Sequence, residues 1–203
     1  MGYDVIGYDP SSFYLREAKK TALRTLRSSN KKPLFLRGNP YQSSSILSTN
    51  KVMNFDAIII MDNSFGYFGK SEDVLMLSEL FKVASKHCLL IIETENRDWR
   101  LSNFEPTTFF TSDTVQMHTV WRFNFETSVS TGMAKFYQKI GNEINNLQLA
   151  LKINILYRLY SLHELREILV SSGWLYKEGY DDIEPLRPFS NDSLSIFSVS
   201  VRQ

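Results

Sequence analysis

The chain is short of cysteine and has no long hydrophobic run. Cys88 is the only cysteine among the 203 residues, so no disulfide can form within the chain. No apolar stretch approaches the roughly 20 residues that cross a bilayer, and the N-terminus lacks a basic-then-apolar signal segment. We therefore expect a cytoplasmic protein in which Cys88, set in the run Cys88-Leu-Leu-Ile-Ile92, is a small buried side chain.

Excess charge, clustered glycine and clustered metal ligands are also lacking. The net charge is +1, so no bulk electrostatic attraction argues for a nucleic-acid partner. The nine glycines are dispersed, with no Gly-x-Gly-x-Gly, and the three histidines are scattered without metal-ligand spacing. With 43% hydrophobic residues, the composition is that of one soluble globular domain with room for an insertion.

Strands and helices alternate through the first part of the chain. Residues 55–61 are apolar without alternation, as in a parallel strand covered on both faces. The order strand, helix, strand, loop, strand, helix, strand is typical of a doubly wound α/β sheet. The expected strands are Tyr3 to Tyr8, Leu34 to Leu36, Phe55 to Met61 and His87 to Glu93, with helices starting at Ser11 or Ser12 and at Ser71.

The middle of the chain has a different period. Apolar and polar residues alternate along residues 115–160, which predicts half-exposed antiparallel strands. Turns are predicted at Ser130-Thr-Gly132 and at Gly141-Asn142. We therefore expect an α/β core at residues 1–114 and 161–203, and a small antiparallel sheet at 115–160 that forms a lid.

The C-terminal part carries a strong helix-start signal. Ser161 and Glu164 have the spacing of a capping box, which predicts a helix that runs to Gly173. Strands at Trp174 to Tyr180 and Ser193 to Val201 then form an antiparallel pair at the sheet edge. Ser161 and Glu164 are capping residues in this interpretation and have no catalytic role.

Three motifs together resemble the class I S-adenosylmethionine (SAM) dependent methyltransferases of the small-molecule type. They are Gly2-Tyr-Asp-Val-Ile-Gly-Tyr-Asp-Pro-Ser11, Met61-Asp-Asn-Ser-Phe-Gly-Tyr-Phe68, and Arg158-Leu-Tyr-Ser-Leu-His-Glu-Leu165 followed by Gly173-Trp174. The resemblance implies that Asp9 accepts hydrogen bonds from the ribose hydroxyls of SAM. Asn39 stands where the family usually has an aspartate that meets the adenine amino group, and its amide oxygen can accept the same bond.

The resemblance also implies a set of site residues and a cofactor, SAM. No catalytic residue is assigned, because the family reaction needs alignment and water exclusion and only sometimes a general base. No metal site is expected. The implied cofactor-binding residues are Asp9, Pro10, Asn39, Met61, Asp62, Asn63 and Ser64, and the implied substrate residues are Phe65, Tyr67, Arg158 and Tyr160.

One part of the family pattern is missing from this sequence. In the family, the glycine-rich loop follows a first strand that lies between the strands matched by residues 3–8 and 55–61, and a helix follows the loop. The fold expected here is therefore a Rossmann-like α/β sheet without its first strand and helix. Either the flanking strands pair directly, or a second chain or a homodimer partner supplies the unit, or the sequence is a fragment.

The function expected from these features is methyl transfer from SAM to a small molecule by a truncated or split enzyme. The alternative is a non-catalytic, methyltransferase-like subunit that binds another protein through its exposed edge. A nicotinamide- or nucleotide-binding protein is less favoured, because it also needs the glycine fingerprint. The methyl acceptor is not defined by the sequence, and neither membrane nor nucleic acid is an expected partner.

Overall fold

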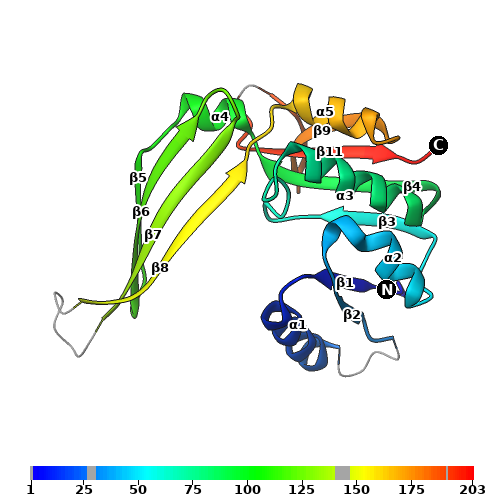
Figure 1. The fold of residues 1–203 in the computed structure, drawn as a ribbon, viewed down its shortest axis with the longest axis horizontal. Coiled ribbons are helices and arrows are strands. Elements are labelled where there is room, and N and C mark those ends of the chain that lie inside the picture. The colour runs from blue at the N-terminus through cyan, green and yellow to red at the C-terminus, as the bar shows by residue number, and fades with distance from the viewer. Residues whose placement is uncertain (1, 27–30, 140–146, 191) are drawn as a thin grey trace.

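The computed structural model describes residues 2–26, 31–139, 147–190 and 192–203. Its strands form a five-stranded sheet, a separate two-stranded sheet and a four-stranded antiparallel sheet that projects from the rest as an arm (Figure 1). The α/β core with a mixed sheet and the separate antiparallel sheet are confirmed. None of the described helices is long and apolar enough to span a membrane.

The five-stranded sheet has the order β10-β9-β11-β4-β3. Strands β3 and β4 are parallel, whereas β11 is antiparallel to both of its neighbours. The predicted antiparallel pair near the C-terminus is thus confirmed, although β10 beyond it was not predicted. The bounds are Phe55–Ile60 for β3, Ala84–Glu95 for β4, Leu175–Ile183 for β9, Leu186–Pro188 for β10 and Ser195–Val201 for β11.

Two helices cover one face of this sheet and enclose the main core (Figure 1). They are α3 (Lys70–Val83) and α5 (Leu162–Ser171), and α5 begins with the predicted capping box. Trp174 is 1% exposed and its indole Nε1 donates to the Leu77 carbonyl at 3.0 Å, which ties the end of α5 to α3. Cys88 is buried in this core, as predicted.

The opposite face of the sheet and the outer edge of β3 are open. Ile59 is 66% exposed and Leu89 is 41% exposed, although both lie in the middle of parallel strands. Strand β3 ends the sheet order, so its outer edge has no strand partner in the described structure. The prediction that both faces of this strand are covered is therefore wrong: α3 covers one face and no described helix covers the other.

The N-terminal residues form a small unit of their own. Strands β1 (Ile6–Asp9) and β2 (Leu34–Arg37) pair in parallel, and α1 (Ser12–Thr25) packs beside them. The Ser11 hydroxyl caps α1, and Leu15 is the only residue of this helix that is buried in the described structure. Because β1 pairs with β2 and not with β3, direct pairing of the two flanking strands, one of the three expected outcomes, does not occur.

The arm consists of four antiparallel strands, and it begins at Thr107 rather than at Val115. The extra strand β5 (Thr107–Thr111) has the sequence Thr-Thr-Phe-Phe-Thr, which gave no clear alternation. It pairs with β6 (Val115–Asn124), followed by β7 (Val129–Lys139) and β8 (Leu147–Arg158). The antiparallel sheet therefore begins nearer the N-terminus than predicted.

The turn predicted at Ser130-Thr-Gly132 is also wrong, because these residues lie inside β7 and the turn falls at residues 125–128. Glycine at position 132 allows the Trp121 ring to pack against the backbone, because a Cβ atom there would lie 2.5 Å from the ring. The turn predicted at Gly141-Asn142 lies outside the described residues.

Besides strands β5 and β10, three short helices were not predicted. They are a 3-10 helix η1 (Pro40–Gln42), α2 (Ser43–Thr49) and α4 (Arg97–Ser102). All three follow strand ends, and α2 contacts α3 beside the loop that follows β2. Their shortness explains the failure, since helices of one or two turns have no measurable apolar period.

Candidate functional site

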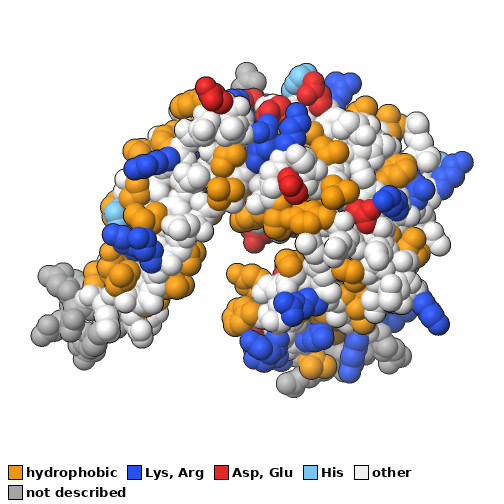
Figure 2. Space-filling view, viewed as in Figure 1, with side chains coloured by type: hydrophobic (Ala, Val, Ile, Leu, Met, Phe, Trp, Pro, Cys, Tyr) orange, Lys and Arg blue, Asp and Glu red, His pale blue; other side chains and the backbone are white. Residues whose placement is uncertain are grey.

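The candidate site lies where the parallel strands end. Strands β1 and β2 run in one direction, β3 and β4 run in the same direction, and their C-terminal ends face the arm (Figure 1). Asp9 ends β1, and residues 61–69 follow β3. The two segments that the resemblance links to SAM therefore lie on the same edge of the α/β core. Figure 2 shows that the molecule is hollowed on this side, between the arm and the part that carries β1 and α1.

Asp9 and Asn39 both organise turns at this edge. The Asp9 carboxylate accepts from the Ser11 backbone N–H at 2.6 Å, which sets the start of α1. The Asn39 side chain accepts from the Tyr41 N–H at 3.2 Å and caps η1, while its backbone carbonyl accepts from the Tyr8 hydroxyl at 2.8 Å. Carboxylate and amide oxygens can each accept further bonds, so both residues retain capacity for hydroxyl or amino groups.

Pro10 lies in the same turn as Asp9. Its carbonyl accepts from the Arg37 guanidinium at 3.0 Å, which ties the end of β1 to the end of β2. The turn is thus braced by a neighbouring strand as well as by α1. Asp9 is consequently held in one orientation relative to the open edge.

The loop after β3 is tightly held in an uncommon backbone conformation. Asp62 and Asn63 both have positive φ angles, 57° and 53°, which non-glycine residues seldom adopt. The Glu93 carboxylate accepts from the Asp62 N–H, and the Asn63 side chain accepts from the Glu95 N–H at 2.6 Å. The Ser64 N–H closes the turn on the Met61 carbonyl at 3.2 Å. Such strain persists where surrounding contacts fix it, and it is concentrated at functional sites.

The aromatic residues of the loop divide into buried and exposed ones. Phe65 is 1% exposed and lies 5.4 Å, between ring centroids, from Tyr160, which is fully buried. Tyr67 is 45% exposed, and its ring lies 6.0 Å from that of Tyr157 on the arm. Of the predicted substrate residues, Tyr67 has a surface that a ligand can reach, whereas Phe65 and Tyr160 face the core.

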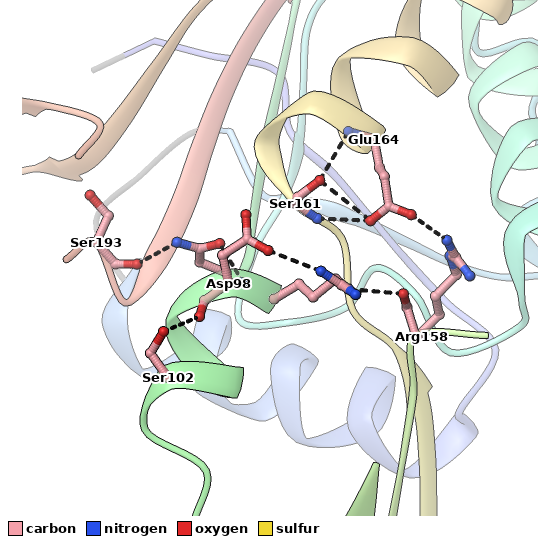
Figure 3. Close-up of polar contacts among 9 residues, drawn as sticks. Asp98, Ser102, Arg158, Ser161, Glu164 and Ser193 are labelled. Atoms are coloured by element: carbon pink, nitrogen blue, oxygen red, sulfur yellow. Dashed lines mark hydrogen bonds and ion pairs between the residues drawn. The ribbon is translucent and has the colours of Figure 1, made fainter. Parts of the chain in front are cut away.

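The Arg158 side chain is occupied by contacts with other residues of the chain. Its guanidinium pairs with Glu164 at 2.7 Å (Figure 3). It also lies over the Tyr160 ring, 4.9 Å from the centroid. The same Glu164 accepts from the Ser161 N–H in the capping box (Figure 3). Arg158 therefore joins the root of the arm to the start of α5, and its side chain is only 12% exposed.

A polar cluster beneath the arm was not predicted from the sequence. Glu95, at the end of β4, accepts from the Tyr157 hydroxyl at 2.9 Å and pairs with Arg100 at 3.1 Å. Arg100 also lies over the Trp121 ring at 5.1 Å. Burial raises the pKa of Tyr157 above its ordinary value, and the Glu95 carboxylate adds to this shift. The alternation that placed Tyr157 on one face of its strand was the only signal for this cluster.

Two open hollows lie elsewhere in the described structure, one beside α1 and one on the arm. The larger, about 390 Å³, lies between α1 and β2 and includes Leu23 and Phe35. The smaller, about 220 Å³, lies on the arm and includes Phe109 and Tyr137. Neither includes Asp9 or the loop at 61–69, so these two hollows do not define the site. Across the described ranges, no three His, Cys, Asp or Glu side chains come together as a set of metal ligands.

Comparison with solved structures identifies the fold. The chain is similar to a SAM-dependent methyltransferase from Clostridium acetobutylicum ATCC 824, with 14% identity, a TM-score of 0.78, and coverage of 98% of this chain and 75% of that chain. The chain has the fold of the class I SAM-dependent methyltransferases. No protein-family model matches the sequence, and no curated protein matches it either.

Two further methyltransferases with this fold match nearly the whole chain. The CcbJ methyltransferase from Streptomyces caelestis is 15% identical, with a TM-score of 0.77 and coverage of 100% of this chain and 80% of that one. SAM-bound CalS10, an amino pentose methyltransferase from Micromonospora echinaspora involved in calicheamicin biosynthesis, is 13% identical, with a TM-score of 0.61 and coverage of 98% and 74%. This methyltransferase-fold chain thus spans about three quarters of the length of these proteins.

Proposed function

We propose that the chain is the larger part of a truncated or split SAM-dependent methyltransferase that methylates a small molecule in the cytoplasm. The observation that supports this best is that Asp9 and the Asp62–Phe68 loop lie on the same edge of an α/β core with a methyltransferase fold. SAM, when bound, supplies a methyl group on a positively charged sulfur. The protein residues then have to hold, orient and shield the reactants.

The described residues fit one half of a SAM site. Asp9 has acceptor capacity for ribose hydroxyls, and Asn39 has it for an amino group on a purine edge. The braced backbone of Met61 to Ser64 presents polar groups beside them. The other half of the site, a backbone cradle of closely spaced glycines, has no counterpart in this sequence.

The open edge supports the second element of the proposal, a missing strand and helix. Strands β1 and β3 point the same way, belong to different sheets and each lie at a sheet end. The outer edge of β3 has no strand partner in the described structure, and Ile59 on this strand is 66% exposed, so backbone groups and apolar surface are left to water. One more parallel strand would pair with the outer edge of β3, and a helix after it would cover the exposed face of the sheet. Such a unit comes from a second chain, from a homodimer partner or from an upstream segment.

The arm supports a small acceptor. Tyr67, Tyr157 and Trp121 form a contiguous aromatic surface where the arm meets the core. An aromatic surface suits contact with a compact ligand that has an apolar face. SAM-bound CalS10 acts on an amino pentose, and KedS8 is a sugar N-methyltransferase, so this fold carries small-molecule methylation elsewhere.

The test is to restore the missing unit. A strand, a Gly-x-Gly loop and a helix are fused ahead of Gly2, and methyl transfer from labelled SAM is measured on a panel of small amines, phenols and amino sugars. We expect transfer to at least one acceptor and loss of transfer on Asp9→Ala. Absence of SAM binding by a well-folded fusion would contradict the proposal.

A non-catalytic role is the second candidate, and the free edge favours it directly. A subunit of this kind would bind a partner protein through β1 and β3 and would never bind SAM. Gel filtration with and without a candidate partner tests association, and an in-frame Gly-x-Gly in the DNA just upstream would favour the enzyme.

A further inference from the structure

The loop at 61–69 is joined to the root of the arm through its buried side. The Arg158 N–H donates to the Gly66 carbonyl at 2.7 Å, and a Cβ atom on Gly66 would lie 2.2 Å from the Arg158 carbonyl oxygen. Gly66 has a φ of 96°, a conformation that a side chain would strain. The chain segments thus touch backbone to backbone, with no room for a side chain between them.

A buried pair of polar side chains lies directly under this contact. The Tyr160 hydroxyl donates to the Asp73 carboxylate at 2.6 Å, and both residues are 0% exposed. Asp73 belongs to α3, whereas Tyr160 follows β8 at the root of the arm. Packing alone does not require this pair, because a buried carboxylate is costly unless its bonds are specific.

The pair fixes three elements at one point. Tyr160 packs on Phe65, its carbonyl accepts from the Arg97 N–H at 3.0 Å, and its hydroxyl reaches α3. Phe65 in turn anchors the loop whose next aromatic residue, Tyr67, is exposed toward the arm. The direction in which Tyr67 is presented therefore depends on where Tyr160 is held.

We propose that Asp73 and Tyr160 are positioning residues of the candidate site, which lock the 61–69 loop against the root of the arm. The proposal rests on the proposed function, since it concerns the same site, but it makes claims that do not require SAM. Phe65 and Tyr160, predicted from the sequence as substrate residues, act in this account through Tyr67 rather than by touching a ligand.

The charge of Asp73 is set by the groups around it. Desolvation raises its pKa to about 6, opposed by the Tyr160 hydroxyl, the Gly66 backbone amide and the Arg158 guanidinium, while Glu72 adds to the rise. Tyr41, on η1, faces the same carboxylate, and its own pKa is raised by burial and by Glu72 and Asp73. A change in the protonation of Asp73 should therefore change the environment of the Gly66 backbone amide.

Hydrogen exchange of the loop amides tests the proposal. The variants are Tyr160→Phe, which removes the donor, and Asp73→Asn, which keeps an acceptor oxygen but removes the negative charge, each with little change of shape. Tyr180→Phe is the matched control, since Tyr180 also donates to a carboxylate, Glu178 at 2.6 Å, but on the exposed side of β9. We expect exchange at residues 61–69 to rise about tenfold or more in the two variants, the effect of losing a hydrogen bond to a charged group. The control should leave the loop unchanged.

The pH response distinguishes positioning from general stability. In the unaltered chain the Gly66 amide resonance should shift with pH near the Asp73 transition; Asp73→Asn should abolish the shift, and Tyr160→Phe should move it to higher pH. Faster exchange spread equally over β4, β9 and β11, or a Gly66 resonance that ignores pH, would overturn the proposal. Neither result depends on SAM binding, so failure here is separable from failure of the proposed function.

Discussion

At the level of single residues, Gly132 shows why a local sequence pattern can predict the wrong structure. Gly132 looks like a turn residue beside Ser130 and Thr131, yet it lies in the middle of β7. The Trp121 ring occupies the space above it, and the Trp121 Nε1 donates to Thr108 at 3.0 Å on the next strand. A local pattern cannot reveal this use of glycine, because the ring comes from a different strand.

Substituting Gly132 tests that reading. Gly132→Val should lower the free energy of unfolding by about 2 kcal/mol, because the new side chain meets the Trp121 ring and forces repacking. Urea unfolding measures the change. Gly2→Val is the control, since nothing lies within 4 Å of a Cβ atom there. Equal stability of the two variants would contradict the packing role.

Asp73 gives a second prediction at this scale, through pH. Burial raises its pKa from 3.8 to about 6, so the folded chain binds this proton more tightly than the unfolded chain does. The contribution to stability is therefore fully present below about pH 4 and is lost as the pH rises toward 6. Unfolding free energies from pH 4 to 7 should show the stability of the natural chain relative to Asp73→Asn decreasing across that window. A difference that grows with pH would contradict this assignment.

Elements with a clear period were predictable, and elements that depend on distant contacts were not. The capping box at Ser161 fixed the start of α5, and the apolar run around Cys88 fixed β4 within a few residues. Strand β5 and helix α4 were not predicted, because Thr107–Thr111 and Arg97–Ser102 are too short for a clear period, and β5 forms by pairing with β6. The burial of Phe65 could likewise not be predicted, because its ring packs on Tyr160, which is far away in the sequence.

The open edge of β3 gives a prediction about an element. Ile59→Lys should change the stability of the 203-residue chain by no more than about 0.5 kcal/mol, because the side chain is already 66% exposed. In the chain fused to a strand and helix, the same change should cost about 2 kcal/mol, since Ile59 is then buried.

Leu156→Lys is the control for this comparison, because Leu156 is 54% exposed on the arm, away from the open edge. It should have the same small effect with and without the added unit. Thermal unfolding of the two variants and of the unsubstituted protein, each with and without the added unit, measures the difference. A penalty for Ile59→Lys that is no larger in the fusion than in the chain alone would show that the added helix does not cover β3.

At the scale of the whole molecule, the two parts of the α/β core meet without sharing a sheet. β1, β2 and α1 form one part, and the five-stranded sheet with α3 and α5 forms the other. The matches to solved methyltransferases cover 98% to 100% of this chain and so include both parts. The alternation of strands and helices and the antiparallel pairing of β9 with β11 were predictable from the sequence, whereas the separation of the sheets needed coordinates.

Calorimetric titration of SAM tests the central claim most directly, because a half-site and a whole site differ in affinity rather than in fold. We predict no measurable binding to the 203-residue chain and micromolar binding to the chain fused to a strand, Gly-x-Gly loop and helix, with that binding lost on Asp9→Ala. Micromolar binding by the 203-residue chain alone would contradict the account, and so would a fusion whose affinity is indifferent to Asp9.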